Sequence, residues 1–128
     1  MSCRSWTLTI PAPAPWMNVN QRQHGRALAG TVKLWRDAAH VYARQAKLPK
    51  LGRAAITATL HFPDLRYSDA PNYYLTIKAA IDGLVDGEVL DDDDDLHVTE
   101  LTIRRGELIP RKPGGPAGQL VLTIREVS

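Results

Sequence analysis

The sequence predicts a single α+β domain with a mixed β-sheet and two main helices. Four short segments alternate apolar and polar residues, which is typical of half-buried strands. Two longer segments repeat apolar residues every three or four positions, which is typical of helices. Their order is strand, helix, strand, helix, strand, strand, and this order favours an α+β arrangement. The 128 residues suffice for one such domain with its own hydrophobic core.

The first predicted strand covers residues 5–10. Its apolar residues fall on one face: Trp6, Leu8 and Ile10. Three prolines then end the strand and stiffen the segment that follows: Pro11, Pro13 and Pro15. Residues 16–24 are polar and irregular, which favours a loop.

The first predicted helix covers residues 26–47 and carries two stripes. One stripe is apolar and is expected to face the core: Leu28, Val32, Trp35, Ala39, Tyr42 and Ala46. The other is basic: Lys33, Arg36, His40, Arg44 and Lys47. The basic stripe is either a solvated helix face or a surface that follows DNA phosphates, and in the second case Lys33 and Arg36 bind DNA.

The rest of the chain completes the pattern. A turn at 48–53 contains Pro49 and Gly52, an alternating strand covers 54–62, and a loop covers 63–71. The second helix covers 73–85 and ends before Gly87, with three apolar residues inward: Ile77, Ile81 and Leu84. Five adjacent aspartates at 91–95 repel one another and exclude a helix or a central strand there. The last two strands lie around 99–103 and 120–124, separated by a Pro/Gly-rich segment at 111–118.

Charge and cysteine content limit the function classes. The net charge is +2, but 16 basic residues against the 9 acidic residues outside the run at 91–95 leave +7. This distribution fits either a metal site that faces a polyanion or a solvated acidic loop on a basic protein. The lone Cys3 excludes an internal disulfide and a cysteine zinc cluster. No segment has the length of a membrane span or the apolar core of a signal peptide, so we expect a cytoplasmic protein without a membrane partner.

Three acidic features are candidates for chemistry: Asp69 after a strand, Asp82 on a helix, and the run at 91–95. Magnesium prefers oxygen ligands, and one or two carboxylates with several waters suffice. A bound ion can polarise a phosphodiester and activate water. A calcium loop is excluded because Leu96 and Thr102 stand where the EF-hand pattern requires Gly and Glu. By pattern alone, a solvated loop is the more common interpretation of an aspartate run.

The segment DAPNYYLTIKAAIDGLVDGEVLDDD at 69–93 resembles the central motif of RusA-type Holliday junction resolvases. In that family a D-x-D-N element leads into a helix with a lysine and an aspartate, followed by a glycine, a hydrophobic residue and a D-D pair. The segments IPAP at 10–13, MNVNQR at 17–22 and VKLWRDAA at 32–39 are similar to the family's opening. The resemblance covers nearly the whole chain and is strongest at 69–98.

The resemblance implies that residues 1–128 form one RusA-like endonuclease domain. It implies a homodimer that uses Mg²⁺, for which Mn²⁺ can substitute, and nicks two strands of a four-way junction symmetrically in recombination and repair. The family is often phage-borne. The implied catalytic residues are Asp69, Lys78 and Asp92, and the implied metal ligands are Asp69, Asp92, Asp93 and Asp94. Lys78 would also hold a DNA phosphate or stabilise developing charge.

Two departures from the family pattern affect the site. Pro71 stands where the second aspartate of D-x-D-N is expected, and proline has no side-chain ligand. The acidic run is also longer than the D-D pair of the family. If the pair is placed by its distance from Leu90, it falls at 91 and 92, whereas placement by its distance from His97 puts it at 94 and 95. Either other aspartates, Asp82 included, complete the metal shell, or the protein binds branched DNA without cutting it. An interaction module with an acidic loop and no DNA role is the third alternative.

Several single residues have both structural and functional interpretations. Asn18, Asn20 and Arg22 contact phosphate, order the active-site loop or form a polar turn. Lys78 and Asp82 have the spacing of a surface ion pair on a helix.

Other single residues bear on helix capping and on packing. Asn72 is expected to cap the second helix. Trp6 and Trp35 are expected in the core, and Trp16 on a DNA or dimer surface. His97 is either a structural strand residue or a group that supports the site.

Overall fold

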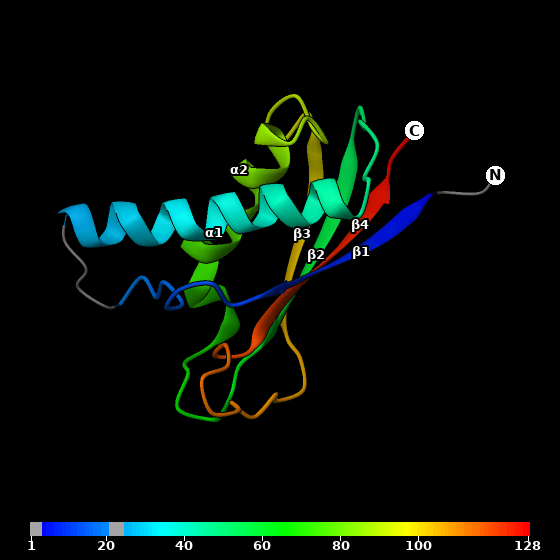
Figure 1. The fold of residues 1–128 in the computed structure, drawn as a ribbon. Helices are drawn as coiled ribbons and strands as arrows, with labels where there is room; N and C mark the ends of the chain where they lie inside the picture. The colour runs from blue at the N-terminus through cyan, green and yellow to red at the C-terminus, as the bar shows by residue number, and fades with distance from the viewer. Residues whose placement is uncertain (1–3, 21–24) are drawn as a thin grey trace.

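The fold is one mixed sheet covered by two helices, as the sequence predicts (Figure 1). The computed structural model describes residues 4–20 and 25–128. The strands are β1 (Ser5–Pro11), β2 (Ala54–His61), β3 (Val98–Arg105) and β4 (Gln119–Glu126). The helices are α1 (Gly25–Gln45), the short 3-10 helix η1 (Ala70–Tyr73) and α2 (Tyr74–Asp86). Every predicted helix and strand is present, with bounds that differ by one or two residues.

The four strands lie in the order β1-β4-β2-β3. β4 runs antiparallel to both β1 and β2, whereas β3 runs parallel to β2. Parallel neighbours cannot be joined by a hairpin and need a crossover connection. The segment with η1 and α2 is that crossover, and it leads the chain from the end of β2 to the start of β3. The acidic run at 91–95 therefore lies just after α2 and just before β3.

One face of the sheet and one side of each helix form the core. The buried sheet residues include Ile10, Ile56, Leu60, Leu120, Leu122 and Ile124. The helices add Trp35 and Ala39 from α1, and Ile77, Ile81 and Leu84 from α2. The predicted inward residues of α2 are thereby confirmed. Among the described residues, no helix has the length and hydropathy to cross a membrane.

The predicted apolar stripe of α1 is correct in its centre and wrong at one end. Trp35 and Ala39 are fully buried, and Leu28, Val32 and Tyr42 are half-buried. Ala46 is exposed because the helix ends at Gln45, and Ala43 is buried in the last turn instead.

Trp16 does not lie on a surface, so its predicted role in DNA or dimer contact is wrong. Its side chain is 3% exposed, and its ring lies 4.9 Å from those of Trp35 and Phe62. The indole Nε1 donates a hydrogen bond to the Ala117 carbonyl at 2.6 Å. The proline-rich segment after β1 returns the chain to the core, where the indole fills the space between α1 and the end of β2. Trp35 is buried as expected, and Trp6 is half-buried.

Asn72 does not cap the second helix, which corrects another expectation. Residues 70–73 form the 3-10 helix η1 with Pro71 in its first turn, and α2 begins at Tyr74. The N-cap position of α2 is Tyr73, and no side chain makes a cap hydrogen bond there. The extra turn places Asn72 one residue too early. Its carbonyl instead accepts a hydrogen bond from the Val19 amide at 2.9 Å.

The close contact of the two helices depends on Gly83. A Cβ at this position would lie 2.3 Å from the Arg36 carbonyl oxygen and 2.8 Å from the Ala39 Cβ. Next to this contact, the Arg36 guanidinium donates two hydrogen bonds to Asp86, at 2.6 and 2.7 Å. A side chain at position 83 would therefore force α2 away from α1.

We expect Gly83→Ala to destabilise the protein by about 1–3 kcal/mol, the usual cost of overpacking. The matched control is Gly30→Ala in α1, where an added Cβ meets nothing within 4 Å. That variant should be unchanged or more stable by up to about 1 kcal/mol, because alanine favours helices. Thermal and urea unfolding of both variants measure the difference. Equal stability of the two variants would contradict the close helix contact.

Candidate functional site

Lys78 lies at the centre of a charged cluster between α2 and the acidic run. Its Nζ donates a hydrogen bond to Asp82 Oδ1 at 3.0 Å, one helical turn away. It also donates to Asp93 Oδ2, so the acidic run folds back against the helix. We call these three residues the Lys78 cluster.

The turn after α2 brings the acidic run to this helix. Glu88 adopts a left-handed conformation with φ of 61°, which reverses the chain. Val89 and Leu90 are then each 1% exposed, and the Val89 carbonyl accepts a hydrogen bond from the Leu51 amide at 2.7 Å. These apolar anchors fix the segment from which the aspartates project.

Asp94 orders the segment that leads into β3. Its carboxylate accepts hydrogen bonds from the amides of Leu96 and His97, both at 3.1 Å, and from the His97 ring at 2.6 Å. Its carbonyl also accepts a hydrogen bond from the Val98 amide at 2.8 Å. The hydrogen bond to the carboxylate raises the pKa of His97 and lowers that of Asp94. Much of the acceptor capacity of this carboxylate is therefore used within the loop, and His97 has a structural role.

The electrostatics of the cluster favour the charged forms of Lys78 and Asp93. The hydrogen bond from Lys78 is the main cause that lowers the pKa of Asp93 to about 2. The same bond is the main cause that raises the pKa of Lys78. The Lys78 ammonium lies between the side chains of Asp82 and Asp93, and an excess of acidic groups around one ammonium attracts a further cation.

A cavity of about 240 Å³ opens beside the cluster. Lys78, Asp93 and Asp95 line it together with apolar residues from α2 and β3, among them Ile81 and Leu101. One cationic donor and two carboxylates therefore face the same space. The sequence leaves Asp95 as one of two alternatives, and Asp92 to Asp94 are preferred, since the orientation of each aspartate depends on the path of the loop.

The other predicted acidic residues lie elsewhere or have other partners. Asp69 is exposed at the start of η1, and its carbonyl accepts a hydrogen bond from the Asn72 amide. Asp92 Oδ1 accepts one from the Asp93 amide at 2.7 Å, and Asp91 pairs with Lys50 at 2.9 Å. Within residues 4–20 and 25–128, no three His, Cys, Asp or Glu side chains form a ready-made metal group. Joint ligation by Asp69, Asp92, Asp93 and Asp94 thus stays a prediction.

The donor chemistry of the cluster nevertheless fits magnesium. Asp82 and Asp93 share one cationic partner through one oxygen each, which holds the two carboxylates close together. Magnesium needs only one or two carboxylates beside its waters. The sequence predicts the pairing of Asp82 with Lys78 from their spacing on the helix. It does not predict that Asp93 contacts Lys78, because this contact depends on the turn after α2.

Asn18 connects the N-terminal polar segment to the loop that carries Asp69. Its Nδ2 donates to Ser68 Oγ at 2.6 Å and to the Tyr73 hydroxyl at 3.3 Å. Its Oδ1 accepts a hydrogen bond from the Asn20 amide at 2.8 Å. Of the three expected roles, loop ordering fits the contacts with Ser68 and Tyr73, and a polar turn fits the contact with Asn20. Arg22 lies outside the described residues.

The two basic residues predicted to bind DNA on α1 both have acidic partners. Arg36 pairs with Asp86 as described above, which raises the pKa of the arginine. Lys33 pairs with Asp37 at 2.6 Å on an exposed part of the helix. Exposed pairs of this kind are weak, so Lys33 can exchange its partner for a phosphate at little cost. Their DNA contacts stay predictions.

We expect Lys78→Met to raise the pKa of Asp93 from about 2 toward its ordinary value of 3.8. The pKa in the folded protein lies below that value, so the pair stabilises the fold above about pH 4 and loses this effect as the pH falls toward 2. A carboxyl ¹³C NMR titration measures the pKa, and acid unfolding measures the stability. Lys33→Met is the control and should leave Asp93 unchanged. An unchanged pKa in Lys78→Met would contradict the cluster.

Comparison with known proteins adds no family to this geometry. No family model matches the chain, and no curated protein matches it. The resemblance to RusA-type resolvases therefore rests on the motifs and their order in the sequence.

Proposed function

We propose that the protein is a magnesium-dependent endonuclease that cuts branched DNA, with the Lys78 cluster as part of its active site. The observation that supports this most is the ammonium of Lys78, which contacts two carboxylates at the edge of a cavity. Phosphodiester hydrolysis needs such a combination, because anionic oxygens must be held while charge moves to the leaving oxygen.

Each member of the cluster has a distinct role in the proposal. An ammonium has three donors, of which Asp82 and Asp93 occupy two, so a phosphate oxygen can accept the third. Asp82 and Asp93 would hold the metal ion, together with Asp95, which lines the same cavity as Asp93. When bound, magnesium would neutralise phosphate charge and acidify water. Pro71 stands where the family has a carboxylate, and we propose that Asp82 supplies that carboxylate instead. Among the described residues, Asp69 has no contact with the cluster.

The choice of DNA as substrate rests on charge and on the resemblance. The chain carries +7 outside the run at 91–95, which suits a polyanion. The resemblance adds the four-way junction and the homodimer, in which two sites would nick opposite strands. These nicks would act in recombination and repair.

The test is cleavage of a labelled four-way junction, with and without Mg²⁺ or Mn²⁺, on a denaturing gel. We expect paired, metal-dependent nicks, and a loss of about 10²–10³-fold in rate for Lys78→Gln, the usual cost of removing one charge-stabilising donor. Asp93→Asn should lose activity as well and keep DNA binding. The control Asp37→Asn, on the exposed face of α1, should keep full activity. Full activity of Asp93→Asn would contradict the assignment.

A second candidate function is binding of branched DNA without cleavage. It is favoured by Pro71 and by the position of Asp69 apart from the Lys78 cluster. It predicts a shifted but uncut junction with either metal, and an affinity that falls steeply with salt. No shift even at low salt would contradict both candidates and favour an interaction module without a DNA role.

A further inference from the structure

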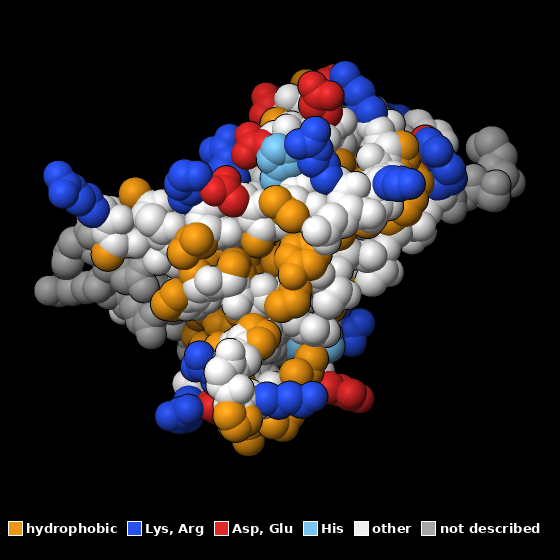
Figure 2. Space-filling model, in the orientation of Figure 1, with side chains coloured by type: hydrophobic (Ala, Val, Ile, Leu, Met, Phe, Trp, Pro, Cys, Tyr) orange, Lys and Arg blue, Asp and Glu red, His pale blue; other side chains and the backbone are white. Residues whose placement is uncertain are grey.

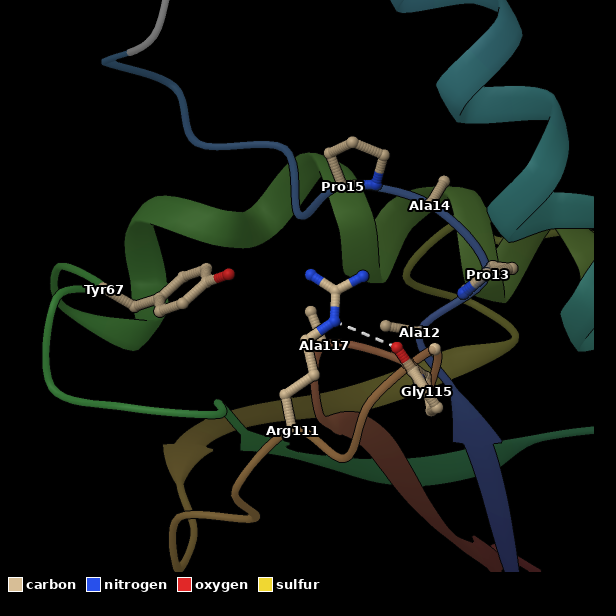
Figure 3. Close-up of a pocket in the computed structure, with 10 residues that line it drawn as sticks. Ala12, Pro13, Ala14, Pro15, Tyr67, Arg111, Gly115 and Ala117 are labelled. Atoms are coloured by element: carbon tan, nitrogen blue, oxygen red, sulfur yellow. Dashed lines mark hydrogen bonds between the residues drawn. The ribbon is translucent and has the colours of Figure 1, made fainter.

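We infer that a second pocket, on the side of the proline-rich segment, binds one phosphate-bearing nucleotide unit of a DNA strand. The pocket lies between residues 12–15, which follow β1, and residues 111–117 of the connection from β3 to β4 (Figure 3). Tyr67 closes a third side. The inference rests on the proposed function only in taking DNA as the polymer to which the nucleotide belongs.

Arg111 supplies the anion-binding group. Its Nε donates a hydrogen bond to the Gly115 carbonyl at 2.9 Å, which fixes the guanidinium plane. In Figure 3 the two terminal amino groups point away from the Gly115 carbonyl toward Pro15, and one of them lies on the side of the Tyr67 hydroxyl. Within the described part of the chain, no carboxylate pairs with Arg111, whereas Arg36 and Arg66 each have an acidic partner. A guanidinium with two free amino groups matches two oxygens of a phosphate.

Tyr67 is held in place before any ligand arrives. Its ring stacks on Phe62, with centroids 4.7 Å apart and an angle of 6° between the planes. Arg105 donates hydrogen bonds to the carbonyls of Tyr67 and Ser68, at 2.9 and 2.5 Å. Burial raises the pKa of Tyr67, so its hydroxyl stays protonated and can donate to an anion. Two hydrogen-bond donors, the Arg111 guanidinium and the Tyr67 hydroxyl, thus border the same cavity.

The size and walls of the cavity favour a nucleotide over a bare phosphate. Its volume is about 490 Å³, within the range of about 300–1,000 Å³ that is typical of small-molecule sites. Pro13, Pro15 and Pro116 supply rigid apolar walls on which a sugar or base can pack. Because proline side chains are already rigid, ligand binding orders them at little cost in conformational entropy.

The surroundings of the pocket also favour an anionic polymer. Figure 2 shows Lys and Arg side chains, beside some acidic ones, at the end of the molecule where the loops after β2 and β3 lie, and Arg66 pairs there with Asp64. Arg66, Arg111 and Lys112 are exposed there. Asp69 follows Tyr67 by two residues and immediately precedes η1, which leads into α2 and Lys78. A strand held in the pocket would thus continue along the loop and helix that carry the proposed active site.

The test is binding of a short fluorescein-labelled single-stranded oligodeoxythymidylate, measured by its fluorescence anisotropy. EDTA is present so that no cleavage occurs. We expect Arg111→Gln to weaken binding about tenfold, the usual effect of losing hydrogen bonds to a charged group. The matched control is Lys112→Gln, which removes the same charge one residue away and does not line this cavity. It should weaken binding much less. Tyr67→Phe, which keeps the ring, should weaken binding by a smaller factor than Arg111→Gln.

Competitors separate the possible ligands. We expect thymidine monophosphate to displace the oligonucleotide from the wild type at far lower concentration than inorganic phosphate, and to be a weaker competitor for Arg111→Gln. Equal loss for Arg111→Gln and Lys112→Gln, or equal competition by inorganic phosphate or polyglutamate, would overturn the inference. Because nicking is not measured, this result is independent of the junction assay. If the junction is nicked in a metal-dependent way but Arg111→Gln binds the oligonucleotide like the wild type, the nucleotide pocket is contradicted and the proposed nuclease function is not.

Discussion

Five consecutive aspartates repel one another, and two ammonium groups and one imidazole ring from three parts of the chain pair with them. Lys50 meets Asp91, Lys78 meets Asp93, and the His97 ring bonds to Asp94. The exposed pairs contribute little to stability on their own. The contact with Lys78 matters more for function, because it fixes the acidic run against α2 and places carboxylates beside a cavity. The position of α2 depends in turn on the close approach to α1 at Gly83, where no side chain could fit.

Two regions of the molecule are proposed to bind phosphate, and one stretch of chain joins them. The pocket with Arg111 and Tyr67 lies at one end of this stretch, and the Lys78 cluster lies on the helix at the other. Asn18 connects to the stretch between them through Ser68 and Tyr73. The N-terminal polar segment thereby supports the loop between the two regions, and a substitution there can affect function without touching the ligand.

Sequence reasoning predicted the fold almost completely, because strand and helix periodicities are local properties. It also predicted the core side of α2 and the non-helical path of the acidic run. Trp16 was misplaced because its burial depends on where the chain goes after the prolines, and local polarity does not contain that information. The partner of Lys78 within the run depends on the turn at Glu88, so spacing alone left several aspartates open. The pocket at Arg111 joins three distant segments, and no single motif marks it.

The central claim is that the acidic run and Lys78 form the place where a divalent cation acts. Paramagnetic broadening of backbone amide NMR signals by low concentrations of Mn²⁺ tests it most directly, without DNA or catalysis. We predict selective loss of signals around Lys78, Asp82 and Asp93, with competition by Mg²⁺, and weaker loss in Asp93→Asn. Broadening centred on other acidic residues such as Asp64 or Asp37, or no selective broadening at all, would contradict the claim.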